Sequence, residues 1–166
     1  MSGLLPQYYQ ALASAERIME IEELPDEKEP LASSEISDIY KNLQGIRFAD
    51  VDFSYDGTRN ILSGVNMQIN KGELVALVGG SGEGKSTIFR MLLGLYPQTK
   101  GEIVAKTNQD IPLDSTLRGL FAYVPQGNLV LSGTIGENIR FCNMEAGVEE
   151  VIEAAKIADL YDFIEK

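Results

Sequence analysis

A glycine-rich loop between an apolar run and a helical pattern constrains this chain more than any other feature. The apolar run, residues 74–78, is typical of a strand buried on both faces of a sheet. Apolar residues at helical spacing then predict a helix over Ser86–Leu95. The loop between them fits G-x-x-x-x-G-K-[ST], the Walker A pattern, which forms a phosphate loop when a strand precedes it and a helix follows. Its residues are Gly79, Gly80, Ser81, Gly82, Glu83, Gly84, Lys85, Ser86 and Thr87.

The residue types in this loop suit the binding of a nucleoside triphosphate. Glycines allow successive backbone N–H groups to turn inward, where a Cβ would clash, and to form a nest for an anion. The start of the following helix adds N–H groups and partial positive charge. Lys85 brings a full charge toward the β- and γ-phosphates, and Ser86 places a hydroxyl for Mg²⁺. We expect the Glu83 carboxylate to point to solvent, away from a bound anion. The alternative interpretation is a glycine-rich turn with an exposed lysine.

The rest of the chain predicts an N-terminal helix, a linker and an α/β domain. Tyr8, Leu12, Ala15 and Met19 recur at spacings of three and four, which favours a helix over residues 7–21. Residues 22–30 contain two prolines and five acids, a composition typical of a solvated linker. Alternating patterns beyond residue 45 predict antiparallel strands at 46–53 and 64–70, further strands at 103–105 and 121–124, and helices at 135–140, 148–158 and 160–164.

Charge and composition exclude several classes of function. The net charge of −11 repels the nucleic-acid backbone, so we expect no nucleic-acid partner. The chain contains no histidine, which excludes histidine acid/base catalysis and histidine metal ligation within it. The single Cys142 cannot form an internal disulfide. No apolar run of the sequence is long enough to predict a membrane span.

Three further segments resemble the ATPase domain of ABC transporters. The stretch Val51-Asp52-Phe53-Ser54-Tyr55 is similar to the A-loop of that family, which implies that Tyr55 stacks on adenine. The stretch Ala122-Tyr123-Val124-Pro125-Gln126 resembles the Q-loop, and the continuation from Leu131 to Ile139 resembles the exporter branch. This implies that Gln126 approaches Mg²⁺ and the attacking water, so that Lys85 and Gln126 would be the catalytic residues. Ser14–Ile21 resembles the segment that joins the last membrane helix of an exporter to its ATPase domain.

The resemblance implies a fold, ligands and partners. The fold class is α/β, a P-loop NTPase core with an antiparallel β subdomain and a mixed sheet, truncated before the Walker B strand. Residues 1–24 would be the end of the membrane-domain extension, 25–45 an acidic linker, and 46–166 the N-terminal half of the ATPase domain. The implied ligands are ATP and Mg²⁺. The implied partners are the transmembrane domain of the same transporter and a second ATPase domain in a dimer, at the cytoplasmic face of the membrane, with this chain itself soluble.

Several motifs that the family uses for hydrolysis are absent from the sequence. Leu131-Ser132-Gly133 continues with Thr134, so the signature Leu-Ser-Gly-Gly-Gln does not occur. No stretch of four apolar residues ending in Asp-Glu follows Gln126, and there is no switch histidine. Transfer of a phosphoryl group to water needs a held metal, an oriented water and stabilised charge. We therefore predict that this chain binds nucleotide and hydrolyses little, while the intact parent couples ATP hydrolysis to export.

Two other functions stay open at this point. A different P-loop enzyme, such as a small kinase, would require an acceptor site and a lid, and it would transfer phosphate to small acceptors. A non-enzymatic assembly module would depend on residues 1–45 and the C-terminal helices more than on nucleotide. Its oligomeric state, measured with and without Mg-ATP, would distinguish it from an ATPase.

Overall fold

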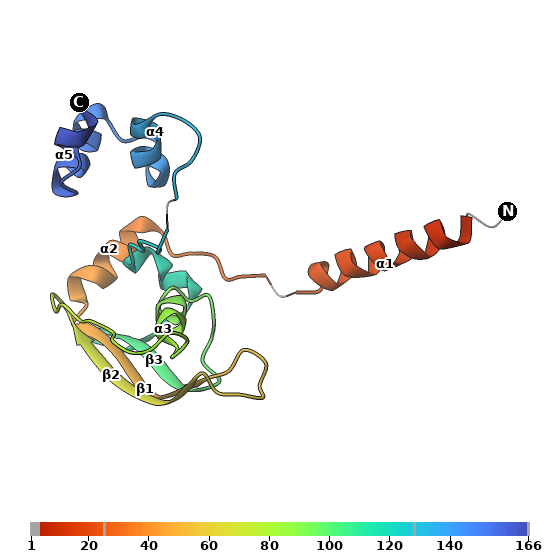
Figure 1. Cartoon of the computed structure of the whole chain (residues 1–166). Helices are drawn as coiled ribbons and strands as arrows, with labels where there is room; N and C mark the ends of the chain where they lie inside the picture. Colours follow the sequence, from red (N-terminus) through yellow and green to blue (C-terminus); the bar gives the residue numbers. More distant parts are fainter. Residues whose placement is uncertain (1–3, 25, 128, 166) are drawn as a thin grey trace. The chain divides into compact units, whose positions relative to one another are not determined.

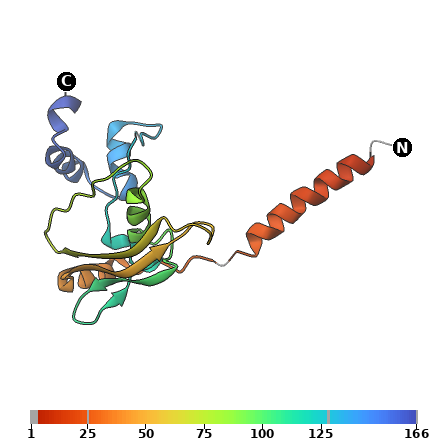
Figure 2. The same ribbon diagram turned by 60° about the horizontal axis from the view of Figure 1, so that its bottom comes forward.

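The computed structural model describes residues 4–24, 26–127 and 129–165, which form two units that divide between Ala122 and Tyr123. The first unit contains a four-stranded sheet in the order β2-β1-β3-β4, in which every pairing is antiparallel. Figures 1 and 2 show the long β1 and β2 side by side, with α3 against one face of the sheet. The strands of the sheet are β1 (Gly45–Phe53), β2 (Leu62–Asn70), β3 (Lys100–Lys106) and β4 (Ile111–Pro112).

The alternating apolar residues of the central strand β1 set its pairing register with both neighbouring strands. Phe48 lies opposite Met67 of β2 and Ile103 of β3. The register shifts on both sides after this point, and Asp50 has a positive φ of 50°. Here the backbone of β3 approaches so closely that a Cβ on Gly101 would lie 2.3 Å from the Asp50 carbonyl oxygen. The predicted strands at 46–53, 64–70 and 103–105 are thus confirmed.

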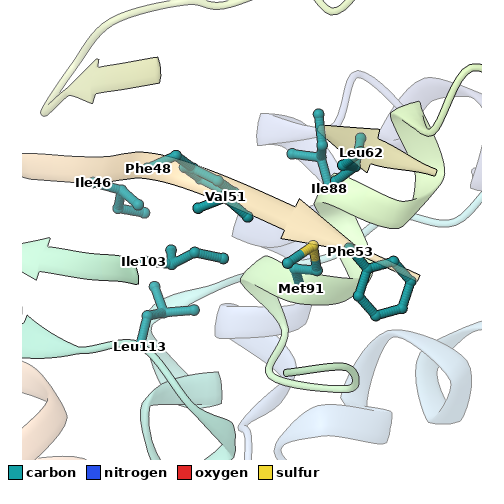
Figure 3. Close-up of a cluster of buried hydrophobic side chains, with 9 residues drawn as sticks. All are labelled: Ile46, Phe48, Val51, Phe53, Leu62, Ile88, Met91, Ile103 and Leu113. Atoms are coloured by element: carbon teal, nitrogen blue, oxygen red, sulfur yellow. The ribbon is translucent and has the colours of Figure 1, made fainter. Parts of the chain in front are cut away.

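The core lies between this sheet and the helix α3 (Lys85–Leu92). Apolar side chains of the sheet meet Ile88 and Met91, which lie one helical turn apart on the same face of α3. Burial of this face fixes the helix, and therefore the loop before it, against β1 and β2. Figure 3 shows the cluster, which consists of Ile46, Phe48, Val51, Phe53, Leu62, Ile88, Met91, Ile103 and Leu113.

Two helices precede the sheet. The predicted N-terminal helix is confirmed as α1 (Leu4–Glu22), and all of its described side chains from Tyr8 onward are exposed. A second helix, α2 (Ser33–Asn42), lies inside the stretch that we interpreted as a linker. It packs beside the 3₁₀ helix η1 (Ser115–Leu120).

The acidic segment before α2 is exposed over residues 26–30, and it also pairs with η1 and the residue before it. The Glu27 carboxylate pairs with the Arg118 guanidinium, and this hydrogen bond lowers the pKa of Glu27. Lys28 pairs with Asp114 at 2.7 Å. The N–H of Leu31 donates to the carbonyl of Thr116 at 3.1 Å. These contacts bind the segment to the domain at three points.

The second unit consists of short helices, as the sequence predicts. The first of them begins with a capping box, in which the Thr134 hydroxyl accepts from the Glu137 N–H and the Glu137 carboxylate accepts from the Thr134 N–H. The side chain of Asn138 donates to the carbonyl of Leu131 and accepts from its N–H, which fastens the preceding loop to this helix. The elements are α4 (Ile135–Ile139), η2 (Arg140–Cys142), α5 (Val148–Ile157) and α6 (Tyr161–Ile164).

Two predicted strands are wrong. Residues 74–78 and 121–124 have no regular secondary structure. Leu74 and Val78 are 99% and 89% exposed, although Leu77 packs against the core. A strand of a parallel sheet needs a hydrogen-bonded neighbour, and among the described residues neither segment has one. The sheet is therefore the antiparallel part of the expected fold, without a parallel part in the portion of the chain that the structure describes.

Within the residues that the structure covers, none of the helices combines the length and apolarity that crossing a bilayer requires.

Candidate nucleotide-binding site

The glycine-rich loop is joined to α3 by a turn at Gly84, a position that suits only glycine. Gly84 has a φ of 85° in the left-handed region, and a Cβ there would lie 2.7 Å from Leu62 Cδ2. Its carbonyl is the first acceptor of the helix, bonded by the N–H groups of Thr87 and Ile88. The N–H groups of Lys85 and Ser86 come before that first bond, so they belong to the helix start that can bind an anion.

The Lys85 ammonium lies inside the loop. Its Nζ donates to the carbonyl of Gly79 at 2.9 Å and also to the carbonyl of Gly80. These contacts hold a positive charge against the backbone of the first two loop residues. The side chain therefore folds back across the loop instead of extending away from it.

The carboxylate of Glu83 differs from the expectation that it faces solvent. One of its oxygens accepts from the N–H of Gly80 at 2.6 Å. A Cβ built on Gly79 would lie 2.3 Å from that same oxygen, so the carboxylate packs directly against the loop backbone. The physical reason is that an N–H of the loop is a strong donor, and the carboxylate three residues away is the nearest charged acceptor.

Tyr55, for which the resemblance implies stacking on adenine, lies beside α3. Its hydroxyl is 3.1 Å from Thr87 Oγ1 and accepts from Arg90 Nη1 at 3.2 Å. The bond with Thr87, reinforced by the charge of Arg90, lowers the pKa of Tyr55. Its ring packs edge-on against Phe53 and Tyr96, with centroids 4.8 and 5.2 Å away. The ring is therefore fixed on two sides while half of the residue stays exposed.

The turn that follows Tyr55 is held by one carboxylate. Asp56 Oδ1 accepts from the N–H of Thr58 at 2.9 Å, from that of Arg59 at 3.4 Å and from the Ser54 hydroxyl at 3.2 Å. These bonds, the backbone one from Thr58 first, lower the pKa of Asp56 from 3.8 to about 2. A depressed pKa means that this carboxylate favours the folded turn above pH 3.8 and loses that effect as the pH falls toward 2.

We predict that Asp56 is still ionised at pH 3, because protonation would cost it the bonds of the turn. A carbon-detected NMR titration of its carboxyl group should give a midpoint of about 2, against about 3.8 for the chain unfolded in urea. Equal midpoints in the folded and the unfolded chain would show that the turn does not hold the carboxylate.

The two remaining predicted site residues are Ser86 and Gln126, which we expect to lie near a magnesium ion. Ser86 is exposed at the start of α3, and Gln126 is exposed in the second unit. Among the residues described, no group of three or more acidic or thiol side chains could hold a metal ion. Magnesium that is bound with a nucleotide takes most of its ligands from phosphate oxygens and water. A serine hydroxyl is a suitable further ligand for such an ion. The roles of Ser86 and Gln126 as ligands both stay predictions.

Sequence reasoning missed the partners that position Tyr55. Thr87 was assigned only to the loop, Tyr96 received no role, and Arg90 was not singled out. Arg90 lies two residues after Ile88, so the helical pattern puts it on the exposed face of α3. This position is the one signal in the sequence that Arg90 could contact a residue outside the core. The contact of Tyr55 with Thr87 and Arg90 depends on how α3 packs on β1, which no local pattern encodes.

Comparison with known proteins places the chain in a family. Residues 62–165 match the family model described as ABC transporter. A Rickettsia bellii protein whose name describes an export ATP-binding/permease protein is 38% identical over 98% of this chain. ABC transporter B family member 1 of Dictyostelium discoideum is 35% identical over 100% of it. This chain spans 28% and 18% of the length of these two relatives.

A solved structure agrees with this result. The chain resembles the structure of a bacterial Atm1-family ABC exporter with ATP bound, at a TM-score of 0.73 and 34% identity, over 94% of this chain and 27% of that one. This likeness confirms the P-loop NTPase fold. The chain belongs to the ABC transporter family.

Proposed function

We propose that this chain is the ATP-binding part of an exporter's ATPase domain and that it binds ATP with Mg²⁺ at the loop Gly79–Thr87. The observation that carries the proposal is the position of Lys85, whose ammonium is folded over Gly79 and Gly80 at the start of α3. The ammonium and the helix start together bring positive charge and N–H donors to one point. Of the groups in a nucleotide, the triphosphate is the one that suits this concentration of positive charge and N–H donors best.

The base would be bound by the ring of Tyr55. A half-exposed tyrosine, fixed by hydrogen bonds to the same helix that begins at the phosphate loop, can stack on a purine without further ordering. Because the ring is already fixed, less conformational entropy is lost when the base binds. Ser86 would ligate Mg²⁺, and Gln126 would approach the metal and the attacking water.

The partners that we propose are a transmembrane domain of the same transporter and a second ATPase domain in a dimer, at the cytoplasmic face of a membrane. This is supported by the names of the relatives, of which one is an ATP-binding/permease protein and another an ABC exporter. In the intact parent, ATP hydrolysis would be coupled to export. The chain alone would hydrolyse little, because its sequence has neither the signature motif nor a Walker B stretch.

Titration by calorimetry tests this proposal. We expect one site for Mg-ATP and one for Mg-ADP per chain, and phosphate release close to that of a protein-free control. If neither nucleotide binds, the binding site is refuted. Turnover comparable to that of an intact transporter would refute the prediction of little hydrolysis. Transfer of phosphate to a small acceptor alcohol would favour a kinase instead.

A further inference from the structure

The acidic side chain of the glycine-rich loop occupies one of the loop's own backbone donors. Glu83 Oε2 accepts from the Gly80 N–H at 2.6 Å. The other oxygen would lie 2.9 Å from a Cβ on Gly80, so the whole carboxylate covers this part of the backbone. The Lys85 ammonium meanwhile donates to the carbonyls of Gly79 and Gly80. The Gly80 N–H and two of the three N–H bonds of the ammonium are therefore already paired within the loop.

We propose that Glu83 is a built-in anion that competes with the nucleotide's phosphates for the loop. This inference rests on the proposed function and deepens it, since it names a residue that sets the affinity of the same site. A hydrogen-bond donor that points at a carboxylate cannot serve a phosphate oxygen as well. The carboxylate must rotate away from Gly80 before a phosphate can accept from that N–H, and binding is weaker by the free energy of this displacement.

The carboxylate and the phosphate also repel each other. Like charges a few ångströms apart disfavour each other even at the surface, and more so where water is partly excluded. The chain as a whole carries a net charge of −11, which adds to this repulsion. Competition at the donor and repulsion between the anions act in the same direction, so both weaken the binding of any phosphate.

The test compares Glu83→Gln and Glu83→Asp with the unmodified chain, using calorimetric titration with Mg-ATP and with inorganic tripolyphosphate. Glutamine removes the charge and keeps the shape, and we expect it to bind both ligands about fivefold more tightly, a change of about 1 kcal/mol. Aspartate keeps the charge but is one methylene shorter, so it loses its reach to Gly80. We expect an intermediate gain for Glu83→Asp.

A spectroscopic readout makes the test independent of affinity. In ¹H–¹⁵N spectra without nucleotide, the Gly80 amide proton should move upfield in both variants, because its bond to a carboxylate is weakened or lost. The remaining peaks report that the variants fold. If the Glu83→Asp chain binds like the unmodified chain while Glu83→Gln binds more tightly, the effect is long-range charge and the proposed contact is refuted.

The outcome also separates this inference from the proposed function. If the unmodified chain binds Mg-ATP and loses affinity on Lys85→Ala, yet neither Glu83 variant binds more tightly, the phosphate site stands and the competition is refuted. If no variant binds Mg-ATP or tripolyphosphate, the phosphate site itself is refuted.

Discussion

Replacing Phe48 by alanine is expected to lower the free energy of unfolding by about 3–5 kcal/mol. Phe48 is 2% exposed at the centre of β1, between Met67 of β2 and Ile103 of β3. Truncation removes the contacts of the ring and leaves a cavity where three strands meet, and a rigid sheet collapses little to fill it. A domain of this size has only about 5–15 kcal/mol of stability in total. Urea denaturation followed by circular dichroism measures the loss.

The control for this prediction is the same change at an exposed site. Phe163 in α6 is 74% exposed, so Phe163→Ala should change the free energy by less than about 0.5 kcal/mol. If the two variants have equal stability, the packing of β1 does not hold the first unit together. Because the same cluster fixes α3, we also expect Phe48→Ala to weaken nucleotide binding wherever it leaves the chain partly unfolded.

The parts of the fold that were predicted correctly are those that depend on local patterns. Val65, Met67 and Ile69 alternate strictly, and β2 covers them in the register that this alternation requires. The loop was predictable for a similar reason, because the left-handed turn at Gly84 requires glycine whatever else surrounds it. Antiparallel partners lie close along the chain, so the pairing of β1 with β2 follows from the pattern and the short connection between them.

The prediction of a strand at residues 74–78 is wrong because an apolar run indicates only a preference for burial. It does not indicate which strand, if any, pairs with the segment. Leu74 and Val78 are exposed, as no neighbouring strand among the described residues pairs with this segment. Strand formation there depends on hydrogen bonds from other segments, which a local pattern cannot supply. The same reason accounts for residues 121–124, where Val124 is exposed as well.

The orientation of the side chains in the site also could not be predicted from the sequence. The pattern identifies Glu83 as a loop residue, but only the geometry of the turn brings its carboxylate to the Gly80 N–H. Tyr55 and Thr87 lie 32 residues apart and meet because α3 packs on β1. The site residues stay a prediction from pattern and resemblance, and the packing of α3 on the sheet decides how Tyr55 and Thr87 contact each other.

Replacing Lys85 by alanine is expected to weaken the binding of Mg-ATP by about 10- to 100-fold. Hydrogen bonds between charged groups contribute about 1.5–3 kcal/mol each, and each 1.4 kcal/mol corresponds to a factor of ten in affinity. The variant loses the ammonium that lies over Gly79 and Gly80 and keeps the N–H groups of the helix start. Calorimetric titration measures the change, and binding of tripolyphosphate should weaken by a similar factor.

A general effect of charge has to be separated from the effect of this position. The chain has a net charge of −11, so the loss of any cation increases its repulsion of ATP. Lys41→Ala makes the same change of charge in α2, where Lys41 pairs with Asp38 in an exposed contact at 2.8 Å. We expect this control to bind Mg-ATP within about twofold of the unmodified chain, because salt screens distant exposed charges. If both variants weaken the binding of Mg-ATP equally, Lys85 contributes only through the net charge. That result would refute the loop as the phosphate site.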